Sequence, residues 1–204
     1  MIIGICGFIG SGKDTAADFL VNFHNFKRES YAATLKDAVS DIFGWDREML
    51  EGRTGASRAW REQVDEWWAT RLNMPHLTPR FVLQNWGTNV LREHFHDDIW
   101  IASLENKLRT AKDSIVITDC RFPNEIKGLK AQGAKVVWVQ RGLTPHWYSI
   151  AETANRGDTK AQEWLRNEGI HASEYSWAGT CFDHIIDNNG SLDSLEEQIK
   201  NLVQ

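Results

Sequence analysis

The chain has 204 residues, of which 42% are hydrophobic and 25% charged, and its formal net charge at pH 7 is −5. This size and composition suit one compact domain over residues 1–204, and no stretch approaches the roughly 18 uninterrupted apolar residues of a membrane span. The negative balance disfavours binding to long DNA or RNA, because neutralisation of phosphates by basic residues supplies most of that affinity. Three widely spaced cysteines fit a reducing compartment, and the first residues do not resemble a secretory signal, so we expect a cytoplasmic protein.

The first half of the chain predicts one buried strand followed by several helices. Ile2–Cys6 is a β-branched run typical of a buried strand, and it leads through a glycine-rich turn into a helix over 15–21. Thr78 and Pro79 indicate a further helix start, with Thr as the cap and Pro at the first position. The helices expected here span 35–43, 57–72, 78 to about 94, and 99–111.

The second half predicts more strands separated by helices. Strands are expected over 114–119, 134–140 and 184–186, with a helix from Pro123 to near Gly133 and a C-terminal helix capped by Ser191. Such alternation predicts an α/β three-layer sandwich, a mostly parallel sheet with helices on both faces. The polar segment 141–178 is predicted to form helices outside the sheet, as a lid.

The strongest functional signal is the sequence GFIGSGKDT at 7–15, between the first strand and its helix. Glycines allow the backbone to curl so that successive N–H groups point at phosphate oxygens, at the positive end of a helix dipole. This is the context that a phosphate-binding P-loop requires. We therefore expect the turn and the start of its helix to bind a nucleotide through Gly10, Ser11, Gly12, Lys13, Asp14 and Thr15.

Magnesium ligation departs from the usual pattern. Asp14 stands where Ser or Thr normally faces the ion, so either Asp14 through a water or Thr15 is expected to hold it, together with Asp119. Asp119 ends a hydrophobic strand, although a helix-capping role stays open. Cys120 follows it in place of the glutamate that activates water in many P-loop ATPases. Because side chains alternate along a strand, Arg121 is expected to share a cleft with Asp119, which suits phosphoryl transfer.

A third pattern combines Arg80 and Gln84, which are four residues apart and therefore share one face of a predicted helix. The guanidinium fork can hold an acceptor's phosphate, while the amide reads a base edge. On its own the pair also fits a solvated helix surface. Trp86, which follows closely, favours a nucleobase as the acceptor.

Four motifs occur in one order: GSGKDT at 10–15, YAxxLK at 31–36, RxxxQxxG at 80–87 and DCRFPNE at 119–125. Together they resemble the deoxynucleoside monophosphate kinases of bacteriophages, within the nucleoside monophosphate kinase family. The resemblance extends from the P-loop to about residue 141. It implies a P-loop kinase-type fold and transfer of the γ-phosphoryl of ATP, with Mg²⁺, to a deoxynucleoside 5′-monophosphate for DNA synthesis, in the host cytoplasm for a phage protein.

The implied reaction needs no general base, since the attacking α-phosphate oxygen is already anionic, and catalysis reduces to alignment and charge neutralisation. The catalytic candidates are Lys13, Asp119, Arg121 and Arg141, and Arg156 joins the ATP site from the lid. The acceptor is expected in a helical region over about 35–95, with Glu125 holding its sugar or orienting Arg121. Acceptor-binding candidates are Lys36, Arg53, Arg80, Gln84, Trp86, Thr88 and Glu125.

Two other readings remain open on the residues alone. One is a P-loop kinase for another small phosphorylated acceptor, of the phosphomevalonate or dephospho-coenzyme A type. The other is a P-loop ATPase or regulatory nucleotide-binding module, which would turn over ATP without an acceptor. The expected partners are small nucleotides, and the ten tryptophans leave a homodimer open.

Overall fold

The computed structural model describes residues 1–204 and contains one five-stranded sheet. Its strands are β1 (Ile2–Cys6), β2 (Phe26–Glu29), β3 (Ser114–Ile117), β4 (Lys135–Gln140) and β5 (His184–Asp187). They lie in the order β2-β3-β1-β4-β5, and every pairing is parallel. The central strand β1 pairs with β3 through Ile3 and Val116 and with β4 through Ile5 and Val137. The predicted parallel sheet is confirmed.

The chain divides into two compact units, one formed by residues 1–30 and 105–204 and the other by residues 31–104. The first unit contains the whole sheet, and α8 (Ile99–Thr110) crosses the boundary between the two ranges. The other helices of the first unit are α1 (Lys13–His24), α9 (Pro123–Ala131), α10 (Tyr148–Asn155), α11 (Thr159–Asn167), α12 (Ala172–Tyr175) and α13 (Leu192–Val203). None of the helices combines the length and the apolar character that crossing a bilayer would require.

Helices cover both faces of the sheet, because side chains alternate along each strand. On β1, Ile3 and Ile5 belong to a core that Leu20 of α1 and Ile199 of α13 complete. Gly4 points to the opposite face, where a Cβ would lie only 2.7 Å from Leu129 of α9. The three-layer α/β sandwich expected from the sequence is therefore present.

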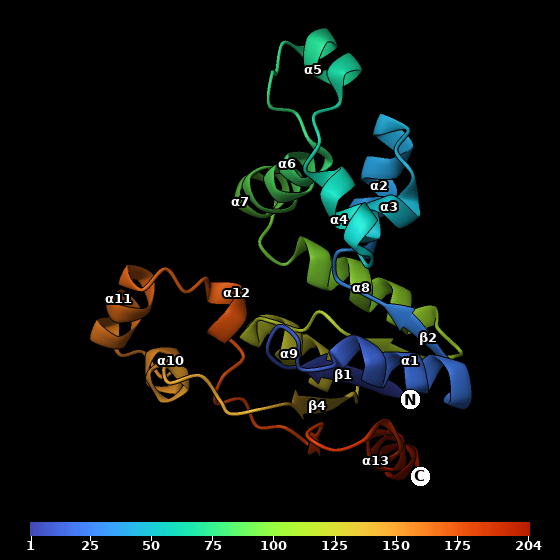
Figure 1. Ribbon diagram of the computed structural model, residues 1–204, viewed down its shortest axis with the longest axis vertical. Helices are drawn as coiled ribbons and strands as arrows, with labels where there is room; N and C mark the ends of the chain where they lie inside the picture. Colours follow the sequence, from blue (N-terminus) through green and yellow to red (C-terminus); the bar gives the residue numbers. More distant parts are fainter. The chain divides into compact units, whose positions relative to one another are not determined.

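The segment between β4 and β5 leaves the sheet, as predicted for 141–178. Figure 1 shows α10, α11 and α12 together in orange and red-orange, apart from the strands. This excursion has a small core of its own, formed by Ala151, Ala154, Leu165 and Ala178. α12 is the last helix of this excursion, and after it the chain returns to the sheet as β5.

The 31–104 unit is helical throughout and corrects one prediction. Its elements are α2 (Ala33–Phe43), α3 (Arg47–Glu51), α4 (Gly55–Arg61), α5 (Glu66–Leu72), α6 (Pro79–Gln84), the π-helical η1 (Asn85–Val90) and α7 (Leu91–His94). The prediction of a single helix over 57–72 is wrong. These residues form two helices, α4 and α5, because Asp65 caps the start of the second. Its side chain accepts the Trp68 N–H at 3.1 Å.

Other boundaries follow local capping signals. The Thr78 hydroxyl accepts the Phe81 N–H at 3.0 Å, which confirms the predicted start, and the helical path reaches His94 through the π-helical turn. Two elements, β2 and α3, were not expected. The sequence of β2, FKRE, carries charges on an edge strand and so lacks an apolar run.

Candidate active site

The turn between β1 and α1 is built on glycines in conformations that other residues rarely adopt. Gly10 has φ 77° and Gly12, the N-cap of α1, has φ 94°. At Gly7 a Cβ would lie 2.5 Å from the Val139 carbonyl oxygen, so the loop passes too close to β4 for a side chain. The turn therefore ends at a helix N-terminus, where unpaired N–H groups favour an anion.

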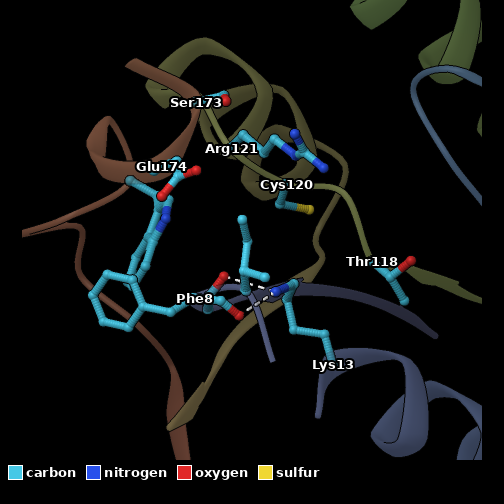
Figure 2. A pocket seen from close by; sticks show the side chains of 10 residues that line it. Phe8, Lys13, Thr118, Cys120, Arg121, Ser173 and Glu174 are labelled. Atoms are coloured by element: carbon cyan, nitrogen blue, oxygen red, sulfur yellow. Dashed lines mark hydrogen bonds between the residues drawn. The ribbon is translucent and has the colours of Figure 1, made fainter. Parts of the chain in front are cut away.

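Lys13 lies at the start of α1 and folds back over this turn. Its Nζ donates to the Gly7 carbonyl at 2.8 Å and to the Phe8 carbonyl at 2.7 Å, as the dashed lines in Figure 2 show. No carboxylate pairs with it. Burial, and secondly the Arg121 guanidinium, lower the pKa of Lys13 from its ordinary value. The ammonium group is thus held at the turn by two carbonyl oxygens, without an ion-pair partner.

A cavity opens beside Lys13, and Figure 2 shows Lys13, Arg121 and Glu174 around the same space. Neither the Arg121 guanidinium nor the Glu174 carboxylate makes a hydrogen bond or ion pair with the protein. With two cations and one carboxylate, the cavity has an excess of positive charge and suits an anionic ligand. Its lining residues are Gly7, Phe8, Ile9, Lys13, Thr118, Cys120, Arg121, Ser173, Glu174 and Trp177.

Glu125 fixes the backbone on which Arg121 stands. It is only 3% exposed, and its Oε2 accepts the Arg121 N–H at 2.8 Å and the Phe122 N–H at 3.0 Å. A carboxylate accepting backbone N–H groups at the start of a helix is a strong, charge-assisted cap. These contacts fit the orientation of Arg121 rather than contact with an acceptor sugar.

The cavity-lining thiol of Cys120 is not a nucleophile. A hydrogen bond with Cys6, and burial, raise the pKa of Cys120 well above its ordinary value, so the thiol stays neutral.

The acidic residues expected to bind magnesium, Asp14 and Asp119, do not line the cavity. Arg28 of β2 donates to the Asp14 carboxylate at 3.1 Å and to the Asp14 carbonyl at 3.0 Å, so this side chain is directed away from the cavity lining. Asp119 is also absent from that lining, although Arg121 belongs to it. We predicted that alternation along the strand places Asp119 and Arg121 on the same side. That prediction is wrong, because β3 ends at Ile117 and both residues lie beyond the strand.

The segment 141–178 is packed on the turn through aromatic rings. The ring centroid of Phe8 lies 4.8 Å from that of Trp177, 5.5 Å from that of Trp147 and 5.9 Å from that of Tyr148. Trp177, 1% exposed, lies two residues beyond the end of α12, and α12 carries Ser173 and Glu174 to the cavity. No motif in the sequence signals these two residues, because only the aromatic packing brings them to the P-loop.

Several predicted residues of this unit lie outside the cavity lining. Thr15 is exposed in the first turn of α1. Arg141 is exposed in the segment after β4, and Arg156 is exposed at the end of α10. Neither arginine forms an ion pair.

The remaining acceptor candidates belong to the 31–104 unit. Here Lys36 pairs with Glu51 at 2.7 Å, and Arg80 pairs with Glu62 at 3.2 Å. Arg80 and Gln84 are one turn apart on α6, as expected from the spacing, and both are exposed. Arg53 and Thr88 are also exposed, whereas Trp86 is half-buried, its ring centroid 5.5 Å from that of Phe43.

The RxxxQxxG motif ends in the π-helical turn η1, a type of distortion that occurs frequently at functional sites. The Gly87 carbonyl accepts the Trp100 indole N–H at 2.9 Å. A Cβ on Gly87 would lie 3.0 Å from Leu35 Cδ2, so the glycine permits close packing against α2. Close packing against α2 therefore explains the glycine of this motif.

Comparison with known proteins identifies the family of this chain. A family model described as deoxynucleotide monophosphate kinase matches residues 51–199. A protein of Acanthamoeba polyphaga mimivirus, provisionally named a deoxynucleotide monophosphate kinase, is 29% identical over 204 residues, covering 93% of this chain and 100% of that one. The deoxynucleoside-5′-monophosphate kinase of Escherichia phage T5 is 26% identical over 180 residues, covering 61% of this chain and 70% of that one.

Solved structures resemble the chain more distantly. A shikimate kinase from Aquifex aeolicus has a TM-score of 0.42 at 13% identity, covering 100% of this chain and 96% of that chain. A dephospho-CoA kinase from Campylobacter jejuni has a TM-score of 0.40 at 14% identity, covering 100% of this chain and 95% of that chain. The α/β fold is shown by the five-stranded parallel sheet itself. Because the family model spans well over half of the sequence, the chain belongs to the deoxynucleotide monophosphate kinase family.

Proposed function

We propose that the enzyme transfers the γ-phosphoryl group of ATP to a deoxynucleoside 5′-monophosphate, giving ADP and the deoxynucleoside diphosphate, a precursor for DNA synthesis. The observation that carries this proposal is the cavity beside the P-loop, where Lys13 and Arg121 present positive charge without a carboxylate partner. The phosphates of ATP would supply the missing negative charge, with the Gly10–Gly12 turn donating backbone N–H groups.

The side chains of the cavity fit phosphoryl transfer without a general base. The acceptor's phosphate oxygen is already anionic, so the protein has to align the two substrates and neutralise charge on the transferred group. Lys13 and Arg121 do so from two sides of the cavity. Phe8 and Trp177 form an apolar wall that excludes water, which limits hydrolysis of ATP as a side reaction.

The oxygen donors near the cavity fit a magnesium ion, which prefers carboxylate and hydroxyl oxygens and retains several waters. Thr118 and Glu174 line the cavity, Thr15 lies in the first turn of α1, and Asp119 directly follows Thr118. Asp14 does not fit, because Arg28 holds its carboxylate. When bound, Mg²⁺ would neutralise charge on the phosphate oxygens of ATP.

We propose that the 31–104 unit binds the acceptor nucleotide. Support comes from the exposed pair Arg80 and Gln84 on α6, in the motif that ends at the packed Gly87. The guanidinium would contact the acceptor's phosphate, and the amide would contact its base. From the first unit, Arg141 and Arg156, which have no ion-pair partners, remain candidates for the triphosphate.

The test is ADP release from Mg·ATP with each deoxynucleoside and ribonucleoside monophosphate in turn, beside a reaction without acceptor. We expect turnover with a subset of deoxynucleotides and almost none without acceptor. Lys13→Ala serves as the inactive control for contaminating kinases. Turnover that needs no acceptor would contradict the proposal and indicate an ATPase, and silence with every nucleotide would indicate another phosphorylated acceptor.

A further inference from the structure

The turn between β5 and α13 contacts the P-loop through one side chain. Asn188, the first residue after β5, donates from its Nδ2 to the Ser11 carbonyl at 2.8 Å. The two residues are 177 positions apart in the chain, and no sequence motif relates them. The approach is close, because a Cβ on Gly12 would lie only 2.2 Å from the same Nδ2. Glycine at position 12 therefore leaves the space that Asn188 occupies.

This hydrogen bond fixes the orientation of the peptide group between Ser11 and Gly12. A trans peptide is planar, so its C=O and N–H groups point in opposite directions. Because the Ser11 carbonyl is turned toward Asn188, the Gly12 N–H points to the other side of the turn. Gly12 is the N-cap of α1, and N–H groups at a helix N-terminus attract phosphate. Asn188 thus orients one of the N–H groups that are expected to donate to the nucleotide.

The turn needs such a constraint because its glycines leave the backbone free. Gly12 has φ 94°, yet glycine populates negative φ about as readily, so rotation of the Ser11–Gly12 peptide costs little by itself. The Ser11 N–H donates to the Phe8 carbonyl at 3.2 Å, whereas the Ser11 carbonyl accepts no backbone hydrogen bond. The side chain of Asn188 is therefore the group that keeps this carbonyl in place.

Asn188 is itself held by the sheet and by α13. Its backbone N–H donates to the Gln140 carbonyl of β4 at 2.8 Å. The preceding residue, Asp187, donates its N–H to Gln198 Oε1 of α13 at 2.9 Å, and its carbonyl accepts from Gln198 Nε2 at 2.8 Å. Because a strand and a helix fix its backbone, Asn188 presents its carboxamide to the P-loop from a rigid base.

We propose that Asn188 is a positioning residue of the ATP site, which holds the Ser11–Gly12 peptide with its N–H directed at the phosphates of the nucleotide. This assignment rests on the proposed function of the P-loop. Asn188 acts through Ser11 and Gly12 and does not itself contact ATP, since the Ser11 carbonyl engages its Nδ2. The anion site is thus ordered before the nucleotide arrives, so binding does not have to supply the free energy of ordering a glycine-rich turn.

The experiment compares Asn188→Ala, which removes the donor, with Asn188→Asp, which puts a carboxylate oxygen in its place at nearly the same volume. Asn189→Ala is the matched control, because Asn189 lies in the same turn but its side chain bonds Asp187 and Gly142 rather than the P-loop. Calorimetry measures the binding of ATP, of adenosine and of inorganic tripolyphosphate, which has phosphates without a base or sugar. Initial rates give kcat and both KM values, and urea unfolding gives the stability.

We expect Asn188→Ala to weaken the binding of both ATP and tripolyphosphate by about 3- to 10-fold, the usual net effect of one hydrogen bond. Asn188→Asp should weaken both by about 10- to 100-fold, because its carboxylate faces the Ser11 carbonyl and adds negative charge near a polyphosphate. The affinity for adenosine and the KM for the deoxynucleotide should not change, and kcat should fall by less than the KM for ATP rises. Asn189→Ala should lose stability yet bind both polyphosphates as the wild type does.

Unchanged affinity of both Asn188 variants for tripolyphosphate would overturn the proposal. So would equal losses for ATP and adenosine, which mark a direct contact with the base, or equal losses in Asn188→Ala and Asn189→Ala, which mark general loosening of the turn. Should the wild type bind neither ATP nor tripolyphosphate, the proposed function fails separately. Crystal structures of the free proteins then test the peptide alone: a Ser11 carbonyl that rotates away in Asn188→Ala supports control by Asn188, and an unchanged peptide refutes it.

Discussion

Replacing Glu125 tests whether the start of α9 positions the guanidinium of Arg121, which we propose acts at the transferred phosphoryl. In Glu125→Ala the N–H groups of Arg121 and Phe122 both lose the acceptor that holds them at 2.8 and 3.0 Å. Hydrogen bonds to a charged group contribute roughly 1.5 to 3 kcal/mol each, and water can rehydrate part of a helix start. We therefore expect the free energy of unfolding to fall by about 2–4 kcal/mol, a large fraction of the usual total.

The same substitution should lower activity through Arg121. A displaced guanidinium at the transferred phosphoryl costs about 10- to 100-fold in kcat, while the KM for ATP changes less. Glu125→Gln keeps one acceptor oxygen and should lose less stability and less activity. The assays are urea unfolding followed by tryptophan fluorescence, and initial rates at saturating substrates.

Lys127→Ala is the control, because Lys127 is exposed on the same helix and should change stability by no more than about 0.5 kcal/mol. Two results would refute the reasoning. Glu125→Ala could unfold at the urea concentration of the wild type, which would show that the cap contributes nothing. Alternatively it could lose stability while keeping its kcat, which would separate Glu125 from the position of Arg121.

Further predictions concern the two ligands. Lys13→Ala should reduce transfer by roughly 10²-fold or more, and retained activity within a few-fold would contradict the P-loop assignment. Because the pKa of Lys13 is lowered, ATP binding should weaken at high pH sooner than an ordinary lysine would allow, and Lys13→Arg should move that loss to higher pH, as a pH titration of ATP affinity will show. Glu174→Gln removes the carboxylate of the cavity, so metal-free ATP should bind several-fold tighter and Mg·ATP weaker; equal changes for both would exclude a metal role. Gln84→Ala should weaken discrimination among bases more than phosphate binding, and equal losses for all acceptors would disprove a base contact.

Much of the fold follows from local sequence. The β-branched run of β1, the glycines of the P-loop and the caps at Thr78 and Ser191 each act within a few residues. Failures occurred where local signals were weak. The edge strand β2 has no apolar run. Over 57–72 the helical spacing of apolar residues continues across the loop, so the start of α5 at Asp65 was missed. Local chemistry therefore predicts elements well and misses short or interrupted ones.

The sequence by itself determined a P-loop, an alternating α/β order and the residue types of a phosphoryl transferase. Tertiary structure alone decided which charged groups are available, because ion pairs form between residues far apart in the chain that no periodicity relates. The Arg28 guanidinium pairs with the Asp14 carboxylate and the Glu51 carboxylate pairs with Lys36, while Arg121 at the cavity forms no ion pair. Likewise, Glu174 lies at the cavity beside the P-loop because the packing of Trp177 on Phe8 holds the end of segment 141–178 there.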